Sequence, residues 1–110
     1  MDELVDPVVL FDGRGHMWWV GDPALAEEEL ESPDEVAAGF DGFGRPVRVK
    51  EDRAGLRLVV ASREPQEKLC RMHVNMYYFK YARIQGLAPP NEILDIREFL
   101  YAVSAGHVEE

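Results

Sequence analysis

The chain has few of the residues that usually carry chemistry: one cysteine and three histidines in 110 residues. A lone cysteine cannot close an internal disulfide, which fits a reducing compartment. The longest uninterrupted apolar runs are only a few residues, so no segment is long enough to span a membrane. The acidic start, MDELVDPVVLFDG, lacks the basic residues and apolar run of a secretion signal. We therefore expect a cytoplasmic protein with no membrane segment.

Basic residues are nearly missing from the first part of the chain. Residues 1–44 hold twelve acids and one base, Arg14, a net charge of −11, whereas residues 45–110 hold nine acids and eleven bases, a net of +2; together these give −9. An acidic half repels nucleic acids and anionic membranes and attracts basic partners. The alternative is that the acids keep the protein soluble and partly face its own basic half.

The rest of the composition is ordinary for a soluble globular protein, with 46% hydrophobic and 30% charged residues. A length of 110 residues fits one domain and leaves little room for two. We predict a single domain over residues 1–110.

Short apolar runs separated by turn sequences predict antiparallel β-structure in the first half. Strands are expected at 8–11, 16–20, 36–40, 45–51 and 56–62. The sequence FDGRG at 11–15 recurs as FDGFG at 40–44, and we interpret both as a strand that ends in a glycine-rich hairpin turn. Two copies are too few to define a repeat architecture.

Helix signals occur in the middle and in the second half. Asp22-Pro23 is a helix start, with Asp as the N-cap and Pro in the first turn, and Ser32-Pro33 offers a second N-cap. A long helix is expected from about 65 to 86, and a last helix from about 91 to 105. The order predicts an α+β fold, in which an antiparallel sheet of about four to five strands, a hairpin plus a meander, packs against two C-terminal helices.

The long helix carries two apolar stripes at helical spacing. The first comprises Cys70, Val74, Tyr77, Tyr81 and Ile84, and the second Leu69, Met72, Met76 and Phe79. The wet side is expected to hold Lys68, Arg71, Asn75, Tyr78, Ala82 and Gln85. Such stripes are usually core, so we expect one to pack on the sheet and the other on the last helix. The alternative is that part of this helix is exposed as an interface.

No motif predicts catalysis, a metal or a cofactor. Cys70 and His73 are neighbours on the helix, but a metal site needs about four ligands, and only His16 and His107 remain, at unknown positions. The DGRG and DGFG turns lack the ligand series of a calcium loop, and no phosphate-binding glycine loop is present. We therefore predict no enzyme activity, no cofactor and no metal.

The charge distribution favours a binding protein. We interpret the chain as a small acidic protein that docks onto a basic protein and neutralises it, an analogy of class with bacterial immunity proteins, which present carboxylates to nuclease-type toxins. The adjacent tryptophans lie in one strand, so they point to opposite faces and one needs a cover or a partner. The predicted partner-binding residues are Trp18, Trp19, Glu27, Glu28, Glu29, Glu31, Asp34 and Glu35.

Two other interpretations stay open. A pocket between sheet and long helix, lined by Cys70, His73, Tyr77 and Tyr81, would indicate a small-ligand domain or an enzyme. A tyrosine-rich helix packed against its own copy would indicate a structural homo-oligomer.

Overall fold

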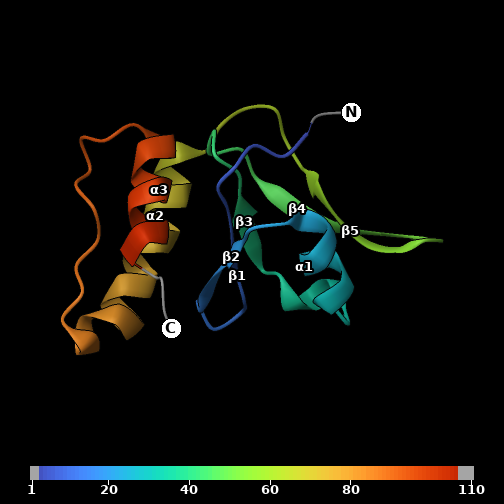
Figure 1. The fold of residues 1–110 in the computed structure, drawn as a ribbon, viewed down its shortest axis with the longest axis horizontal. Helices are drawn as coiled ribbons and strands as arrows, with labels where there is room; N and C mark the ends of the chain where they lie inside the picture. The colour runs from blue at the N-terminus through green and yellow to red at the C-terminus, as the bar shows by residue number, and fades with distance from the viewer. Residues whose placement is uncertain (1–2, 107–110) are drawn as a thin grey trace.

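The computed structural model of the protein describes residues 3–106, and the α+β class predicted from the sequence is confirmed (Figure 1). The strands are β1 (Val8–Phe11), β2 (Met17–Val20), β3 (Ala38–Phe40), β4 (Val47–Asp52) and β5 (Gly55–Val60). The α-helices are α1 (Pro23–Glu29), α2 (Glu67–Tyr77) and α3 (Ile96–Gly106). Three short turns complete the described part: 3-10 turn η1 (Pro33–Glu35), π-helical turn η2 (Tyr78–Ala82) and 3-10 turn η3 (Arg83–Gln85).

Strand β1 is the centre of the fold. It lies between β2 and β3 in an antiparallel three-stranded sheet, paired as Phe11 with Met17 and as Val9 with Phe40. All four of its side chains are buried, because apolar layers cover both faces of the sheet. A run of β-branched and aromatic residues suits a strand that is buried on both sides.

The expectation of one sheet of four to five strands is corrected. Strands β4 and β5 form a separate hairpin, joined to the first sheet by a single bridge between Phe40 and Pro46. The predicted strand at 36–40 is shorter than expected, because Ser32 and Pro33 start the turn η1, which ends at Glu35, and the paired strand comprises only Ala38–Phe40. Within residues 3–106, a three-residue β3 leaves most of β4 without a paired strand on that side.

The two FDGxG sequences build the same five-residue loop. In each, the Asp backbone N–H bonds to the carbonyl four residues on, and the second Gly donates back to the Asp carbonyl. The Asp carboxylate accepts from the backbone N–H two and four residues on, at 2.8 and 2.9 Å for Asp12 and at 3.0 Å for both bonds of Asp41. Gly15 and Gly44 have φ of 87° and 78°, a backbone that favours glycine. The structure thus confirms the interpretation of both sequences as one device.

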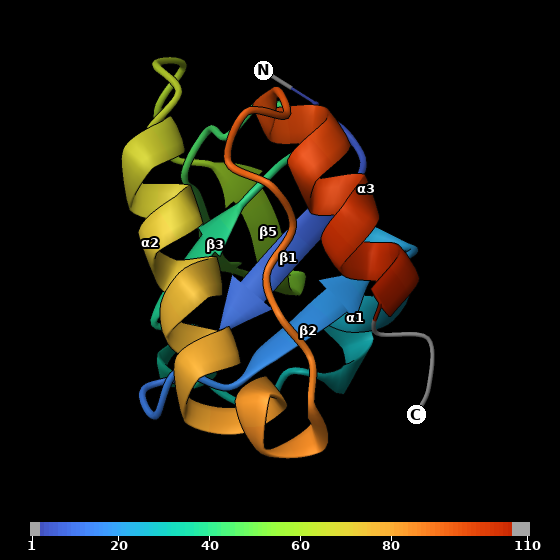
Figure 2. The same cartoon turned by 90° about the vertical axis from the view of Figure 1, so that its left-hand side faces the viewer.

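Two apolar clusters lie on opposite faces of the three-stranded sheet. On one face, Val9 and Phe11 pack with residues of α2, η2 and α3. On the other, Val8 and Leu10 pack with residues of β4 and β5 and with partly buried residues of α1. Figures 1 and 2 show the resulting layers, with α2 and α3 side by side on one side of β1 and with α1 and the β4–β5 hairpin on the other.

The prediction of which helix faces are buried is partly wrong. Cys70, Val74, Tyr78 and Ala82 form the buried row, although Tyr78 and Ala82 were assigned to the wet side. In an α-helix, side chains four residues apart are rotated by about 40° relative to each other around the helix axis. A π-helix has about 4.4 residues per turn, so a four-residue step rotates the other way and offsets this difference. The turn η2 therefore keeps Ala82 in line with Tyr78.

The second apolar stripe is not packed on the last helix, contrary to expectation. Its members Leu69, Met72, Met76 and Phe79 are 41%, 51%, 46% and 59% exposed, and Ile84 of the first stripe is 85% exposed. The helix α3 reaches the sheet beside α2 and packs against the buried row instead. Its Ile96, Phe99, Leu100 and Val103 complete that cluster.

The last helix begins later than predicted, at Ile96 rather than near 91. Asn91 caps a turn, accepting from the Ile93 N–H at 3.0 Å, and Asp95 accepts from the Glu98 N–H at 2.9 Å at the helix start. Figure 2 shows α2 and α3 running in the same direction, so the chain must return along their length before α3. We call residues 86–95 the return segment.

Candidate functional site

Glu27, one of the predicted partner-binding acids, is part of the fold. Its Oε2 accepts the backbone N–H of Leu58 in β5 at 2.6 Å, 31 residues away. This bond satisfies a donor on the outer edge of the β4–β5 hairpin, which would otherwise be open to another strand. The bond also fixes α1 against β5.

Glu35 has a structural role as well. Its Oε2 accepts the Ser32 N–H at 2.8 Å, while the Ser32 hydroxyl accepts the Asp34 N–H at 3.2 Å, a reciprocal capping arrangement at η1. The same carboxylate also accepts the Glu31 N–H. Glu35 is thus engaged in holding the turn that carries its neighbours.

The other four predicted acids lie close together on the surface. All four are exposed: Glu28 and Glu29 end α1, Glu31 lies in the link that follows, and Asp34 lies in the turn η1. They are held in place from both sides, because Asp22 caps the start of α1 with a bond from the Ala24 N–H at 3.0 Å and Glu35 caps η1. Their backbone positions are therefore set by local caps that the sequence itself encodes.

An open groove of about 600 Å³ lies between α1 and the tip of the β4–β5 hairpin. Its polar lining includes Glu27, Glu28 and Glu31, and its apolar lining includes Leu30 and Leu56. We call it the acidic groove. Arg57 also lines it, but its guanidinium lies 3.4 Å from Asp52, with both side chains substantially exposed.

The two tryptophans lie on opposite faces, as predicted from their adjacent positions in β2. Trp19 packs against the cluster beneath α2 and α3, and Trp18 packs against the cluster beneath α1. Both are half-buried. Trp18 belongs to the same cluster as Ala26 of α1 and Leu30, which lines the acidic groove. Trp19 lies on the other side of the sheet.

The four residues of the alternative pocket serve in packing. Cys70 is completely buried, and burial raises the pKa of its thiol to about 12, so the thiol is neutral at physiological pH and a poor nucleophile. The Tyr81 ring stacks on His16 at 4.1 Å, and its hydroxyl donates to the Arg14 carbonyl at 2.7 Å. Tyr77 lies 5.7 Å from the Tyr81 ring. The contacts of Tyr81 with Arg14 and His16 hold the loop at 11–15 against η2.

The His73 ring packs against two aromatic rings that also contact each other, with its centroid 5.1 Å from that of Phe11 and 5.6 Å from that of Phe40. Burial lowers its pKa below the ordinary 6.5. Below about pH 6.5 the unfolded chain therefore binds a proton at His73 more readily than the folded chain does. The free energy of unfolding is then highest above this pH and decreases as the pH falls below it.

We therefore expect His73→Phe to lose less stability than the natural protein between pH 7 and pH 5, as measured by urea unfolding at pH 7, 6 and 5. Hydrogen bonds from backbone N–H groups lower the pKa of Asp95 below 3.8. For Asp12, burial raises the pKa, but hydrogen bonds from backbone N–H groups outweigh it and the pKa is again below 3.8. Neither carboxyl therefore titrates between pH 5 and pH 7. Parallel stability curves for the two proteins would contradict the prediction.

The sequence interpretation missed a second exposed feature, the row Leu69, Met72, Met76 and Phe79 on α2. Its signal was present in the spacing of three, four and three residues, but the row was assigned to the core. This row borders another open groove, described below.

Within residues 3–106, no three His, Cys, Asp or Glu side chains come together as a set that could hold a metal ion. His107 lies outside the described residues. None of the described helices combines the length and the apolar character needed to cross a membrane. No protein-family model matches the sequence, and neither a curated protein nor a solved structure is similar enough to count as a match.

Proposed function

We propose that the protein is a small non-enzymatic binding protein that uses its acidic groove and the neighbouring acids to dock onto a basic protein and neutralise it, in the manner of an inhibitor of the immunity-protein class. The observation that carries this proposal is the exposure of Glu28, Glu29, Glu31 and Asp34 within seven residues, beside a groove with an apolar floor.

The geometry supports recognition of a basic surface in two ways. The four carboxylates are presented by a capped helix and a capped turn, so little backbone conformational entropy is lost when they engage a partner. Leu30 and Leu56 in the groove offer apolar area between the charges, and such area supplies affinity where charges mainly supply specificity and association rate.

The test is neutralisation of these four acids by E28Q/E29Q/E31Q/D34N, which changes the net charge from −9 to −5. We expect a column of the natural protein to capture a basic protein from a lysate of its own cells at low salt. The purified partner is then titrated by calorimetry, and the variant is expected to raise its Kd by about 100-fold, roughly 3 kcal/mol.

The matched control E64Q/E67Q/E92Q/E98Q also changes the net charge from −9 to −5 but neutralises exposed acids of the second half that do not line the acidic groove. We expect this control to bind the partner with a Kd within a few-fold of the natural value. Exposed charges that lie more than about 10 Å from the bound partner are screened by salt and contribute little. Equal losses for the two variants would show that net charge alone drives binding, and the proposed surface would then be rejected.

A further inference from the structure

The exposed apolar row on α2 has the spacing of a helix-packing seam. Leu69, Met72, Met76 and Phe79 follow one another at three, four and three residues, the pattern in which one helix packs along another. Single exposed apolar residues are normal on a protein surface, but four that share one helix face form a contiguous patch. Each of the four is at least 41% exposed, so the row is open over its whole length.

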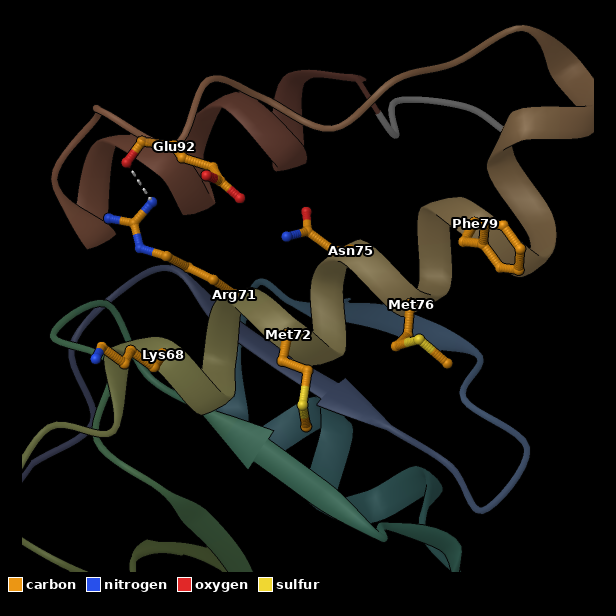
Figure 3. Close-up of a pocket in the computed structure, with 7 residues that line it drawn as sticks. All are labelled: Lys68, Arg71, Met72, Asn75, Met76, Phe79 and Glu92. Atoms are coloured by element: carbon orange, nitrogen blue, oxygen red, sulfur yellow. Dashed lines mark hydrogen bonds between the residues drawn. The ribbon is translucent and has the colours of Figure 1, made fainter.

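A groove runs beside this row. A hollow of about 740 Å³ is lined by Met72, Met76 and Phe79, and Glu92 of the return segment lines it from the other side (Figure 3). A second hollow of about 280 Å³ shares Asn75 and Phe79 with the first and continues toward Leu87. We call the two hollows together the α2 groove. The Oδ1 of Asn75, a residue that lines both hollows, has no hydrogen-bond partner among residues 3–106.

The wall of the α2 groove is fixed before any partner arrives. Arg71 donates from Nη1 to the Glu92 carbonyl at 3.2 Å and from Nη2 to the Leu94 carbonyl at 2.6 Å, and its guanidinium lies 4.8 Å from the centre of the Phe99 ring. These contacts tie the return segment to both α2 and α3. A preformed groove needs less ordering on binding.

The charges around the row are mainly basic, in contrast to the whole protein. Lys68 and Lys80 occupy positions that flank the row on opposite sides, and Arg83 continues it, with its guanidinium 4.5 Å from the centre of the Phe79 ring. Glu92 is an acidic residue that lines the groove beside these basic side chains. The surface therefore combines an apolar line with a positive rim.

We propose that the α2 groove binds an amphipathic helix of a partner protein, with apolar residues spaced by three and four and with acidic residues beside them. The row runs from Leu69 to Phe79, eleven residues that rise by about 15 Å, which matches about three turns of such a helix. The acidic flanks are inferred from Lys68, Lys80 and Arg83. This surface is separate from the acidic groove and takes a partner of opposite charge.

Charge also argues against two other occupants. In a second copy of this chain the same basic residues would flank the same row, so like charges would meet across a two-fold interface. An anionic membrane would attract the basic rim but, being broad, would also face acids elsewhere on a protein whose net charge is −9, whereas a short acidic helix meets the rim alone. Both occupants are outcomes of the test below.

The probe is a synthetic 18-residue helix with Leu at the seam positions and Glu at the flanking positions, and its control carries Lys in place of Glu. Binding to the full chain is measured by fluorescence polarisation at low salt. We expect the Glu peptide to bind at micromolar concentration and the Lys peptide to bind at least about tenfold more weakly. Equal affinities, or no binding of the Glu peptide, would overturn the proposal.

The variant M72A/M76A is expected to weaken the Glu peptide by at least about tenfold. The control L25A/Y101A truncates two exposed apolar residues that do not line the groove and is expected to bind within about twofold of the natural protein. Since all four side chains are about half exposed, both variants keep their thermal melts. The variant E28Q/E29Q/E31Q/D34N keeps peptide binding, which separates this surface from the acidic groove. An unchanged affinity in M72A/M76A would overturn the proposal.

Two further measurements use the same variant. If light scattering gives a dimer mass that M72A/M76A reduces to a monomer mass, the row is a self-interface and the proposal fails. If the natural protein sediments with vesicles of 30% anionic lipid and M72A/M76A does not, the row is a membrane surface and the proposal also fails. A monomer that stays in the supernatant supports a protein partner.

Discussion

Replacement of Asp41 by alanine is expected to lower the free energy of unfolding by about 3–5 kcal/mol, a large part of the roughly 5–15 kcal/mol that holds a domain of this size together. Asp41 is completely buried, and its pair with Arg45 is nearly so, with 12% of the arginine side chain exposed. Urea unfolding at pH 7 measures the loss.

The expected effect is large because this carboxylate serves many donors. Its Oδ2 accepts from Arg45 Nε at 2.9 Å and Nη2 at 2.6 Å, and from the Val5 N–H at 3.3 Å. Its Oδ1 accepts the Phe43 and Arg45 N–H groups. Alanine leaves these donors without their acceptor in a place that water does not reach freely, and unpaired buried groups are expensive.

Asp12→Ala is the matched control, because Asp12 makes the same backbone bonds in the first loop. Its side chain is 34% exposed, and that of its neighbour His16 is 48% exposed, so water can replace the lost bonds. We expect a loss of about 1 kcal/mol. Equal losses in the two variants would show that the loop hydrogen bonds matter and that burial of the Asp41–Arg45 pair does not.

Gly42→Ala is expected to destabilise the protein by about 2–3 kcal/mol, the second large effect. A Cβ at Gly42 would lie 2.1 Å from the carbonyl oxygen of Asp6 and 3.0 Å from that of Val5. Both atoms are backbone, so the clash cannot be relieved by a side-chain rotation. The N-terminal segment would have to move and would lose the bond from the Gly42 N–H to the Val5 carbonyl.

Gly13→Ala places the same change at the equivalent position of the first loop, where a Cβ would meet nothing within 4 Å. We expect its free energy of unfolding to stay within about 0.5 kcal/mol of the natural value. Thermal and urea unfolding of both variants measure the difference. If Gly42→Ala were as stable as Gly13→Ala, the N-terminal segment could not lie over the second loop as described.

Local sequence signals predicted the elements that depend on local interactions. Asp22-Pro23 and Ser32-Pro33 carry their own caps, so both starts were placed correctly. The loops at 11–15 and 40–44 close through bonds among their own residues, so their likeness was visible in five letters of sequence. Strand runs such as Val8–Phe11 were also predicted, because their apolar character is continuous.

Features that depend on distant contacts could not be predicted. Asp12 and Asp41 share their local sequence, but only the second is covered by the N-terminal segment, so only it is buried. Glu27 was predicted to face a partner, although a strand 31 residues away uses its carboxylate. The row at Leu69 and Met72 is as apolar as the buried row, and the docking of α2 on the sheet and against α3 decides which of them is covered.

The position of β1 between the two apolar clusters has a consequence for how the molecule opens. Val9 and Phe11 belong to the layer beneath α2, and Val8 and Leu10 belong to the layer beneath α1. Because each layer loses its contacts with β1 when it opens, we expect the two layers to open cooperatively and the β1 amides to be among the slowest to exchange with solvent. A ligand held on either layer therefore slows hydrogen exchange on the opposite one.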